Sequence, residues 1–182
     1  MKDKILIVDD ELLVVKALQR SLNDERFEIF QAQSGKAALE IMHKQKVKVV
    51  ISDERMPEMG GADFLAIVRE KYPATVRIML TGHADITAIM KAVNGGEIYR
   101  FFVKPWDDVE LGLAVRLAVG KYDLEEENRR LLSVIKHQAM EIKFMEKRYP
   151  GISRMEKNMA GSYVMPDMTD EDLAKIIEEY LK

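Results

Sequence analysis

The sequence predicts an α/β fold, a doubly wound (βα)5 parallel sheet with helices on both faces. Five short apolar runs alternate with segments whose apolar residues recur at helical spacing. Strands that alternate with helices form βαβ units, which give a parallel sheet with right-handed crossovers. The runs are rich in Val and Ile, as expected for strands that are covered on both faces.

Each run and each segment between runs is assigned to one element. The predicted strands are Ile5–Val8, Phe27–Gln31, Val47–Ser52, Val76–Leu80 and Tyr99–Val103. Each of the five predicted helices has one apolar stripe, which we expect to face the sheet. In chain order the stripes are Leu12, Val15, Leu18 and Leu22; Ala37, Ala38, Ile41 and Met42; Phe64, Leu65, Ile67 and Val68; Ile86, Ile89, Met90 and Val93; and Val109, Leu113 and Leu117.

Composition narrows the class of protein. A chain of 182 residues that is 47% hydrophobic can bury one good core. The absence of cysteine excludes disulfides and thiolate metal sites. No apolar run reaches the roughly 18 residues of a membrane-spanning helix, and the first residues do not resemble a signal peptide. The net charge of −3 argues against non-specific nucleic-acid binding. We therefore expect a soluble, cytoplasmic protein with neither a nucleic-acid nor a membrane partner.

The fifth helix is predicted to continue beyond a first domain of residues 1–122, as an extended helix over 108–149. Lys121 to Arg148 contains no proline or glycine, and Pro150 and Gly151 are expected to end the helix at Tyr149. A heptad seam fits this segment, with Leu124, Leu131, Gln138 and Met145 at d and Lys121, Asn128, Ile135, Ile142 and Tyr149 at a. Asn128 favours a parallel pair, whereas Leu132, Val134 and Ala139 beside the seam favour a larger bundle. We favour a homodimer through residues 108–148 over a helix folded back on its own domain.

Residues 150–182 are predicted to form a small C-terminal module. Ile152–Lys157 and Ser162–Met165 are candidates for a short hairpin. Thr169 is a candidate N-cap for an amphipathic helix over 170–181, which serves either as a packing element or as a docking helix for a partner protein. The segment has no basic recognition helix, no paired His/Asp metal motif and no phosphate-binding loop, so it predicts neither a DNA-binding, a phosphodiesterase nor an ATPase output.

Polar residues follow four of the five predicted strands. Asp9 and Asp10 follow the first strand, Asp53 the third, Thr81 the fourth and Lys104 the fifth. Taken singly, these residues are typical of a helix cap, a turn or a solvated charge. The carboxyl ends of parallel strands, however, meet at one edge of the sheet, where such folds bind their ligands. Together, the residues predict a single site at that edge.

The chemistry of these side chains favours a cation and a phosphoryl group. Carboxylates about 4 Å apart repel by roughly 4 kcal/mol per pair at an effective dielectric near 20. Three converging acids therefore need a cation, or one of them must bind a proton. Ligands that are all oxygen suit Mg²⁺, and a carboxylate beside this ion can form an acyl phosphate. Lys104 would balance the phosphoryl charge, and Thr81 would donate a hydrogen bond to a phosphoryl oxygen.

Four motifs, "ILIVDDE", "VVISDERMPEMGG", "IMLTGHAD" and "YRFFVKPW", resemble the receiver domain of two-component response regulators over about residues 3–122. The resemblance implies the flavodoxin-like strand order 2-1-3-4-5 and phosphorylation of Asp53 by a histidine kinase or phosphotransfer protein. It also implies that Asp10, Asp53 and the backbone carbonyl of Arg55 bind Mg²⁺, with Asp9 assisting through water. Thr81 and Phe101 then form the switch, although Phe101 is equally explained as a core residue.

Two further residues are interpreted as tuning the site. Arg55 and His83 each lie two positions after a site residue, where they can affect how readily water attacks the acyl phosphate; solvated surface is the alternative. Trp106 is expected to pack at the start of the last helix. The output is expected to be protein–protein interaction or oligomerisation through the C-terminal helix, with a downstream protein that the sequence does not identify.

Two alternative functions fit the sequence less well. An aspartate-nucleophile phosphatase acting on small phosphate esters generally carries a second acid two residues after its nucleophile, where this chain has Arg55. A receiver fold that has lost phosphorylation is disfavoured because Asp9, Asp10, Asp53, Thr81 and Lys104 are all present. We therefore expect a phosphoacceptor that takes part in its own phosphorylation and dephosphorylation rather than an enzyme.

Overall fold

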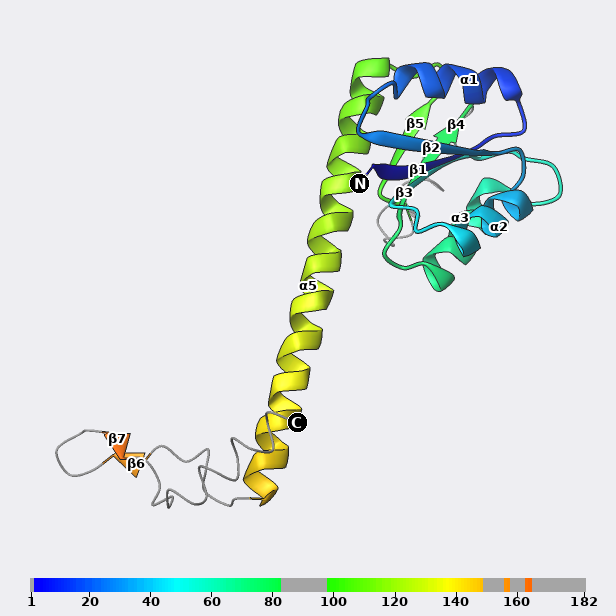
Figure 1. The fold of residues 1–182 in the computed structure, drawn as a ribbon. Helices are drawn as coiled ribbons and strands as arrows, with labels where there is room; N and C mark the ends of the chain where they lie inside the picture. Colours follow the sequence, from blue (N-terminus) through cyan, green and yellow to red (C-terminus); the bar gives the residue numbers. More distant parts are fainter. Residues whose placement is uncertain (1, 83–97, 149–155, 158–162, 165–182) are drawn as a thin grey trace. The chain divides into compact units, whose positions relative to one another are not determined.

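The computed structural model describes residues 2–82, 98–148, 156–157 and 163–164 (Figure 1). The chain divides into two compact units, Met1–Asn128 and Arg129–Lys182, which are described separately. The first unit contains the sheet and all the described site residues. The second contains the last turns of the long helix and a short two-stranded sheet.

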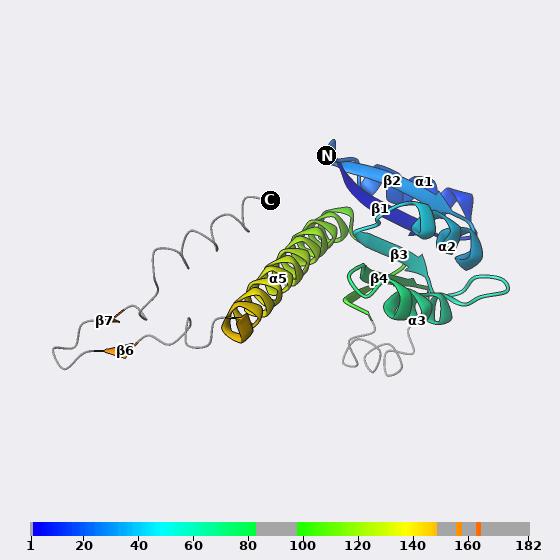
Figure 2. The same ribbon diagram turned by 60° about the horizontal axis from the view of Figure 1, so that its bottom comes forward.

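A five-stranded parallel sheet forms the centre of the first unit. Its strands are β1 (Asp3–Val8), β2 (Phe27–Ala32), β3 (Val49–Asp53), β4 (Val76–Thr81) and β5 (Arg100–Val103). They lie in the order β2-β1-β3-β4-β5, and every neighbouring pair is parallel (Figure 2). The predicted fold class and strand order are confirmed.

Four helices alternate with these strands in the described part of the first unit. They are α1 (Leu12–Ser21), α2 (Gly35–Lys44), α3 (Gly61–Lys71) and α5 (Asp108–Arg148). The hydroxyl of Ser34 caps α2 by accepting a hydrogen bond from the Ala37 backbone N–H at 3.3 Å. The fourth predicted stripe, Ile86 to Val93, lies outside the described residues.

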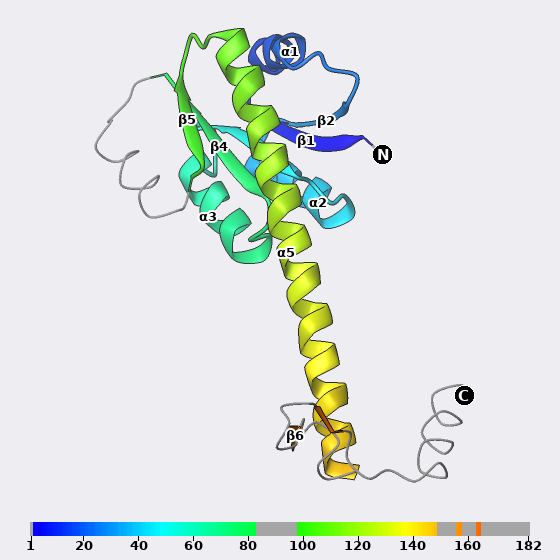
Figure 3. The same cartoon turned by 90° about the vertical axis from the view of Figure 1, so that its left-hand side faces the viewer.

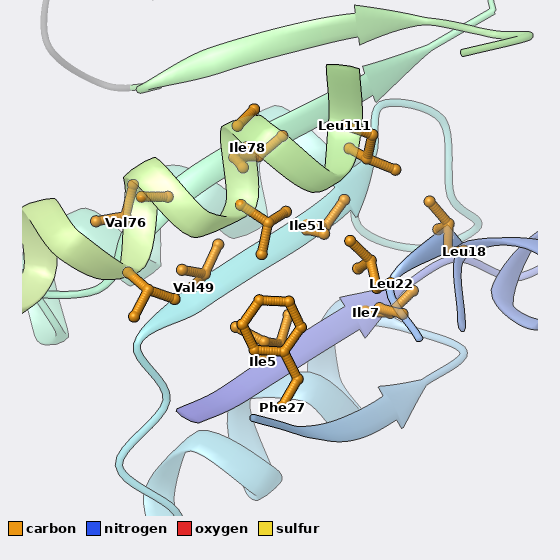
Figure 4. Close-up of a cluster of buried hydrophobic side chains, with 14 of the residues drawn as sticks. Ile5, Ile7, Leu18, Leu22, Phe27, Val49, Ile51, Val76, Ile78 and Leu111 are labelled. Atoms are coloured by element: carbon orange, nitrogen blue, oxygen red, sulfur yellow. The ribbon is translucent and has the colours of Figure 1, made fainter. Parts of the chain in front are cut away.

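The two faces of the sheet carry separate apolar cores because successive strand residues point to opposite faces. On β3, Val49 and Ile51 face a core that includes residues of α1 and α5, while Val50 faces a core that includes residues of α2 and α3. Figure 4 shows the first of these cores, with Leu18 of α1 and Leu111 of α5 close to Ile5, Ile7, Val49, Ile51, Val76 and Ile78. This two-sided burial explains why the central strands β1, β3 and β4 are mostly apolar up to their carboxyl ends.

The face of α5 that packs on the sheet differs from the predicted one. The buried residues are Leu111, Gly112, Ala114, Val115, Ala118, Val119 and Tyr122. The predicted stripe of Val109, Leu113 and Leu117 was wrong, because these residues are 77%, 49% and 52% exposed. Small residues such as Ala114 and Ala118 let the helix lie close to the strands, while Leu113 and Leu117 point outward. The first turns of α5 cross the sheet on the same side as α1 (Figure 3).

Two lysines hold α5 at the last residue of its buried face. Lys46 and Lys48, which lie between α2 and β3, place their ammonium groups 5.9 Å and 5.8 Å from the ring centre of Tyr122. Lys48 also pairs with Asp3 and Asp123, each at 2.6 Å, and Lys46 pairs with Glu126. These contacts fix the helix at the point where it leaves the core.

The second unit includes the last described turns of α5, up to Arg148, and the predicted helix end at Tyr149 lies outside the described residues. Strands β6 (Glu156–Lys157) and β7 (Tyr163–Val164) pair in antiparallel fashion, which confirms the pairing predicted for these two segments. Thr169 and the amphipathic helix predicted over 170–181 lie outside the described residues. Across the described parts of both units, no helix combines the length and apolar character that crossing a membrane requires.

Candidate functional site

The parallel register brings four predicted site residues to the carboxyl edge of the sheet. Asp9 follows the last residue of β1, Asp53 and Thr81 end β3 and β4, and Lys104 follows β5. The register pairs Val8 with Ser52, Asp53 with Leu80 and Thr81 with Val103. The strands therefore end almost level with one another, so their terminal polar residues meet.

Lys104 is the centre of the observed charge arrangement. Its ammonium nitrogen lies 2.8 Å from Asp9 Oδ2 and 2.6 Å from Asp53 Oδ1. Asp9 is fully buried and Asp53 is only 6% exposed, whereas Lys104 keeps partial contact with solvent. One cation thus bridges two carboxylates that would otherwise repel each other in a poorly solvated place.

Backbone donors hold the two carboxylates in fixed orientations. The Glu11 N–H donates to Asp9 Oδ1 at 2.9 Å, and the Arg55 N–H donates to Asp53 Oδ2 at 2.7 Å. Each acid therefore uses one oxygen for a backbone N–H and the other for Lys104. This arrangement keeps the Asp53 carboxylate at the strand end.

The site is electrostatically under-compensated around Asp9. Burial raises the pKa of the Asp9 carboxyl, and the hydrogen bond and charge of Lys104 offset only part of that effect. Burial lowers the pKa of Lys104, but its hydrogen bonds to Asp53 and Asp9 outweigh burial, so the net shift is upward. Loss of solvation at the Asp9 carboxylate therefore outweighs the stabilising contact with Lys104.

The structure adds one residue that the sequence analysis did not identify. The Thr81 hydroxyl, which is fully buried, donates to Glu54 Oε2 at 2.6 Å. Glu54 directly follows Asp53 and is half-buried. Its place beside Asp53 in the sequence is the only signal that could have pointed to it, because its contact with Thr81 depends on the β3–β4 register.

The loop after β3 returns very close to the strand end. The Gly61 N–H donates to the Glu54 carbonyl at 2.8 Å. A Cβ atom on Gly61 would lie only 1.9 Å from the Asp53 carbonyl oxygen. Glu58, in the same loop, has a positive φ of 65°, a backbone conformation that residues other than glycine seldom adopt. The loop therefore packs directly against the backbone of Asp53 and requires glycine at position 61.

The remaining predicted site residues lie around this centre. Asp10, which follows Asp9 in the chain, and the side chain of Arg55, two positions after Asp53, are both exposed. Phe101 is half-buried against the core that includes α2 and α3, and it is Phe102 that is buried in the opposite core. Trp106 packs on that opposite core as expected, and its indole N–H donates to Ser21 Oγ and Asp108 Oδ1. His83 lies outside the described residues.

The donor set of this edge suits a hard divalent cation. Asp9 and Asp53 already share one positive group, and the carboxylates of Asp9, Asp10 and Asp53 supply only oxygen. In the described part of the chain, no three acidic, histidine or cysteine side chains lie close enough to form a ready-made metal site. The residues therefore fit Mg²⁺ chemically, but the exposed Asp10 side chain does not complete a cluster with Asp9 and Asp53 in this arrangement.

Comparison with known proteins places these features in one family. The model of the response regulator receiver domain family matches residues 5–116. The hydrogenase transcriptional regulatory protein HoxA of Cupriavidus necator is 39% identical over 134 residues, which are 72% of this chain and 28% of HoxA. This chain thus spans little more than a quarter of the length of that relative.

Solved structures agree with the fold. The signal receiver domain of an HD domain-containing protein from Pseudomonas fluorescens Pf-5 superposes with a TM-score of 0.65 and 40% identity, over 69% of this chain and 93% of that one. The structure described as adenylate cyclase from Rhodopirellula baltica gives a TM-score of 0.69 and 34% identity, over 73% of this chain and 98% of that one.

Proposed function

Because the chain belongs to the response regulator receiver domain family, we propose that Asp53 accepts a phosphoryl group from a histidine kinase or phosphotransfer protein. The observation that carries the proposal is the bridge by Lys104, 2.6 Å from Asp53 Oδ1 and 2.8 Å from Asp9 Oδ2. A strand-end carboxylate oriented by a backbone N–H and paired with a cation is arranged to act as a nucleophile.

In the proposed reaction an Asp53 oxygen attacks the phosphorus of a phosphohistidine. The P–O bond forms as the P–N bond breaks, and the imidazole nitrogen leaves with the bonding electron pair and takes up a proton from water. Lys104 would then pair with a phosphoryl oxygen instead of an Asp53 oxygen, and Thr81 would donate a hydrogen bond to another. The Arg55 N–H keeps the free carboxyl oxygen of Asp53 oriented.

Receiver domains generally use Mg²⁺ for phosphorylation, and we assign its ligands here to Asp10, Asp53 and the Arg55 carbonyl, with Asp9 acting through water. When bound, the ion would neutralise part of the negative charge on the carboxylates and on the phosphoryl oxygens. The burial of Asp9 and Asp53 supports this assignment, because these two poorly solvated carboxylates share the single ammonium group of Lys104.

A phosphorylation assay tests the proposal. Incubation with a small-molecule phosphodonor and Mg²⁺ is expected to add one phosphoryl group to the intact protein, as measured by mass spectrometry. Asp53→Asn should abolish the addition. Asp63→Asn, which changes an exposed aspartate in α3, should leave it intact. Addition of phosphate to the Asp53→Asn variant at the wild-type level would contradict the assignment of Asp53.

We further propose that α5 carries the output, as a homodimer through residues 108–148 that acts on a downstream protein. Its outward face supports this, because Leu117, Leu124 and Leu131 recur every seven residues and are 52%, 70% and 51% exposed. Ile135 and Ile142 are exposed as well. Replacing both Leu124 and Leu131 by Asp should convert a dimer into a monomer in light scattering. A wild-type protein that is monomeric with and without a phosphoryl mimic would contradict the proposal.

The residue at position 55 favours signalling over the phosphatase alternative. Arg55 stands where an aspartate-nucleophile phosphatase generally has its acid, and its exposed side chain provides no proton donor for a leaving alcohol.

Arg55 and His83 remain assigned to tuning the lifetime of the acyl phosphate. HoxA is described as a transcriptional regulatory protein, but this chain spans only 28% of it, so we do not carry that role over to this chain. Response regulators are usually cytoplasmic, and we propose the same location here.

A further inference from the structure

The hydrogen bond between Thr81 and Glu54 connects the proposed switch residue to an acid with no assigned role. Thr81 Oγ1 lies 2.6 Å from Glu54 Oε2, and Thr81 is fully buried. A threonine hydroxyl has one proton and therefore donates one hydrogen bond at a time. As long as Glu54 accepts that proton, Thr81 cannot donate it to a phosphoryl oxygen.

The backbone holds Glu54 in the position that this contact requires. Its N–H donates to the Leu80 carbonyl, and its own carbonyl accepts from the Gly61 N–H, both at 2.8 Å. The residues on either side of it, Asp53 and Arg55, are joined by the hydrogen bond from the Arg55 N–H to Asp53 Oδ2. Hydrogen bonds of both its N–H and its carbonyl group therefore fix the backbone of Glu54, and this fixed backbone holds the side chain close to Thr81.

We propose that Glu54 is a positioning residue that acts as a latch on the switch: its carboxylate holds the Thr81 hydroxyl until a phosphoryl group on Asp53 competes for the same proton. This inference rests on the proposed phosphorylation of Asp53. A phosphoryl group carries close to two negative charges, about one more than the Asp53 carboxylate that it modifies, and this charge repels the Glu54 carboxylate while attracting the Thr81 donor. The two acceptors therefore favour two discrete arrangements of one hydrogen bond.

The latch has a measurable consequence, because breaking a hydrogen bond to a charged acceptor opposes the switched arrangement. Removing Glu54 should strengthen the binding of beryllofluoride, an acyl-phosphate mimic, by about tenfold, from the usual strength of a charge-assisted hydrogen bond. Glu54→Gln should give an intermediate gain of about threefold, because the amide oxygen still accepts the hydrogen bond but carries no charge.

The test is a double-mutant cycle with fluorine NMR titration of beryllofluoride in the presence of Mg²⁺. The variants are Glu54→Ala, Glu54→Gln, Thr81→Val and the double variant Glu54→Ala/Thr81→Val, with urea unfolding to check that each is folded. Glu58→Gln is the matched control, because it removes one negative charge from an exposed position in the same loop. The latch predicts a tighter complex for Glu54→Ala only when Thr81 is present, and no change in Glu58→Gln.

Two results would overturn the latch. An affinity in Glu54→Ala that is equal to or weaker than that of the wild type would show that the contact does not oppose the switch. The same gain in the Thr81→Val background would show that Glu54 acts through its charge alone. Failure of the proposed function gives a different result: a folded wild-type protein that binds no beryllofluoride would refute phosphorylation of Asp53 and the latch with it.

Discussion

Substitution of Gly61 by Ala tests the close approach that supports Asp53. A Cβ atom at position 61 would lie 1.9 Å from the Asp53 carbonyl oxygen and 2.8 Å from its carbonyl carbon, well inside any normal contact. Because the clash is with backbone, no side-chain rotation relieves it, and the hydrogen bond from the Gly61 N–H to Glu54 must lengthen or break. Overpacking costs about 1–3 kcal/mol, and the lost hydrogen bond adds about 1 kcal/mol. We expect a loss of about 3 kcal/mol in the free energy of unfolding.

The assay is urea unfolding followed by the fluorescence of Trp106, the single tryptophan of the chain. Gly120→Ala is the control, because a Cβ at this exposed helical position meets nothing within 4 Å. It should stabilise the protein by about 0.5–1 kcal/mol, since alanine is the better helix former. We also expect Gly61→Ala to slow phosphorylation, because the backbone that moves is that of Asp53. A Gly61→Ala variant as stable as the wild type would refute the reasoning.

Three further substitutions test separate contacts. Asp9→Asn should raise the free energy of unfolding at pH 7 without Mg²⁺. The pKa of Asp9 in the folded protein lies above its ordinary 3.8, so the wild type loses stability as the pH rises from 3.8 through the folded pKa, and the Asn variant does not. Parallel pH profiles of unfolding for the two proteins would contradict this. Ser34→Ala should lower the free energy of unfolding by about 1 kcal/mol through loss of the α2 cap, whereas Ser133→Ala, at an exposed position of α5, should not. Lys48→Met should lower the free energy of unfolding by about 1 kcal/mol, because Asp3 and Asp123 lose their shared partner. Lys16→Met, at an exposed position, is the control. Equal melting temperatures for the two variants would argue against a stabilising role for the Lys48 contacts with Asp3, Asp123 and the Tyr122 ring.

The sheet and its polar edge were predictable because both follow from rules that act along the chain. Continuous apolar runs that alternate with helical patterns identify the strands, and the carboxyl-edge rule then groups whatever polar residue ends each strand. Asp53 and Lys104 were found in this way although 51 residues of sequence separate them. The rule works because it needs only the direction of the strands and not the distances between their side chains.

The two features that the sequence did not reveal depend on quantities outside any local pattern. The contact between Glu54 and Thr81 follows from the pairing of Asp53 with Leu80, which puts the residue after each into adjacent positions. The stripe predicted for α5 was Val109, Leu113 and Leu117, but the helix packs through a neighbouring face that combines Leu111 and Val115 with the small residues Ala114 and Ala118. Helical spacing fits both faces, and the fit of the side chains against the strands decides between them.

The contacts of the site share one physical feature: each leaves a charge or a hydrogen-bonding group only partly satisfied, and a phosphoryl group and a divalent cation would satisfy it more fully. Lys104 is divided between two carboxylates, and the burial of Asp9 leaves its charge incompletely compensated. Thr81 donates to Glu54, one residue away from the position proposed for the phosphoryl group. A ligand that brings positive charge to Asp9 and negative charge to Lys104 and Thr81 would satisfy these groups better than they satisfy one another. Such a site favours binding of the phosphoryl group and the cation because its groups are less well satisfied without them. The free energy gained when they bind is then available to move the elements that carry Thr81 and Lys104.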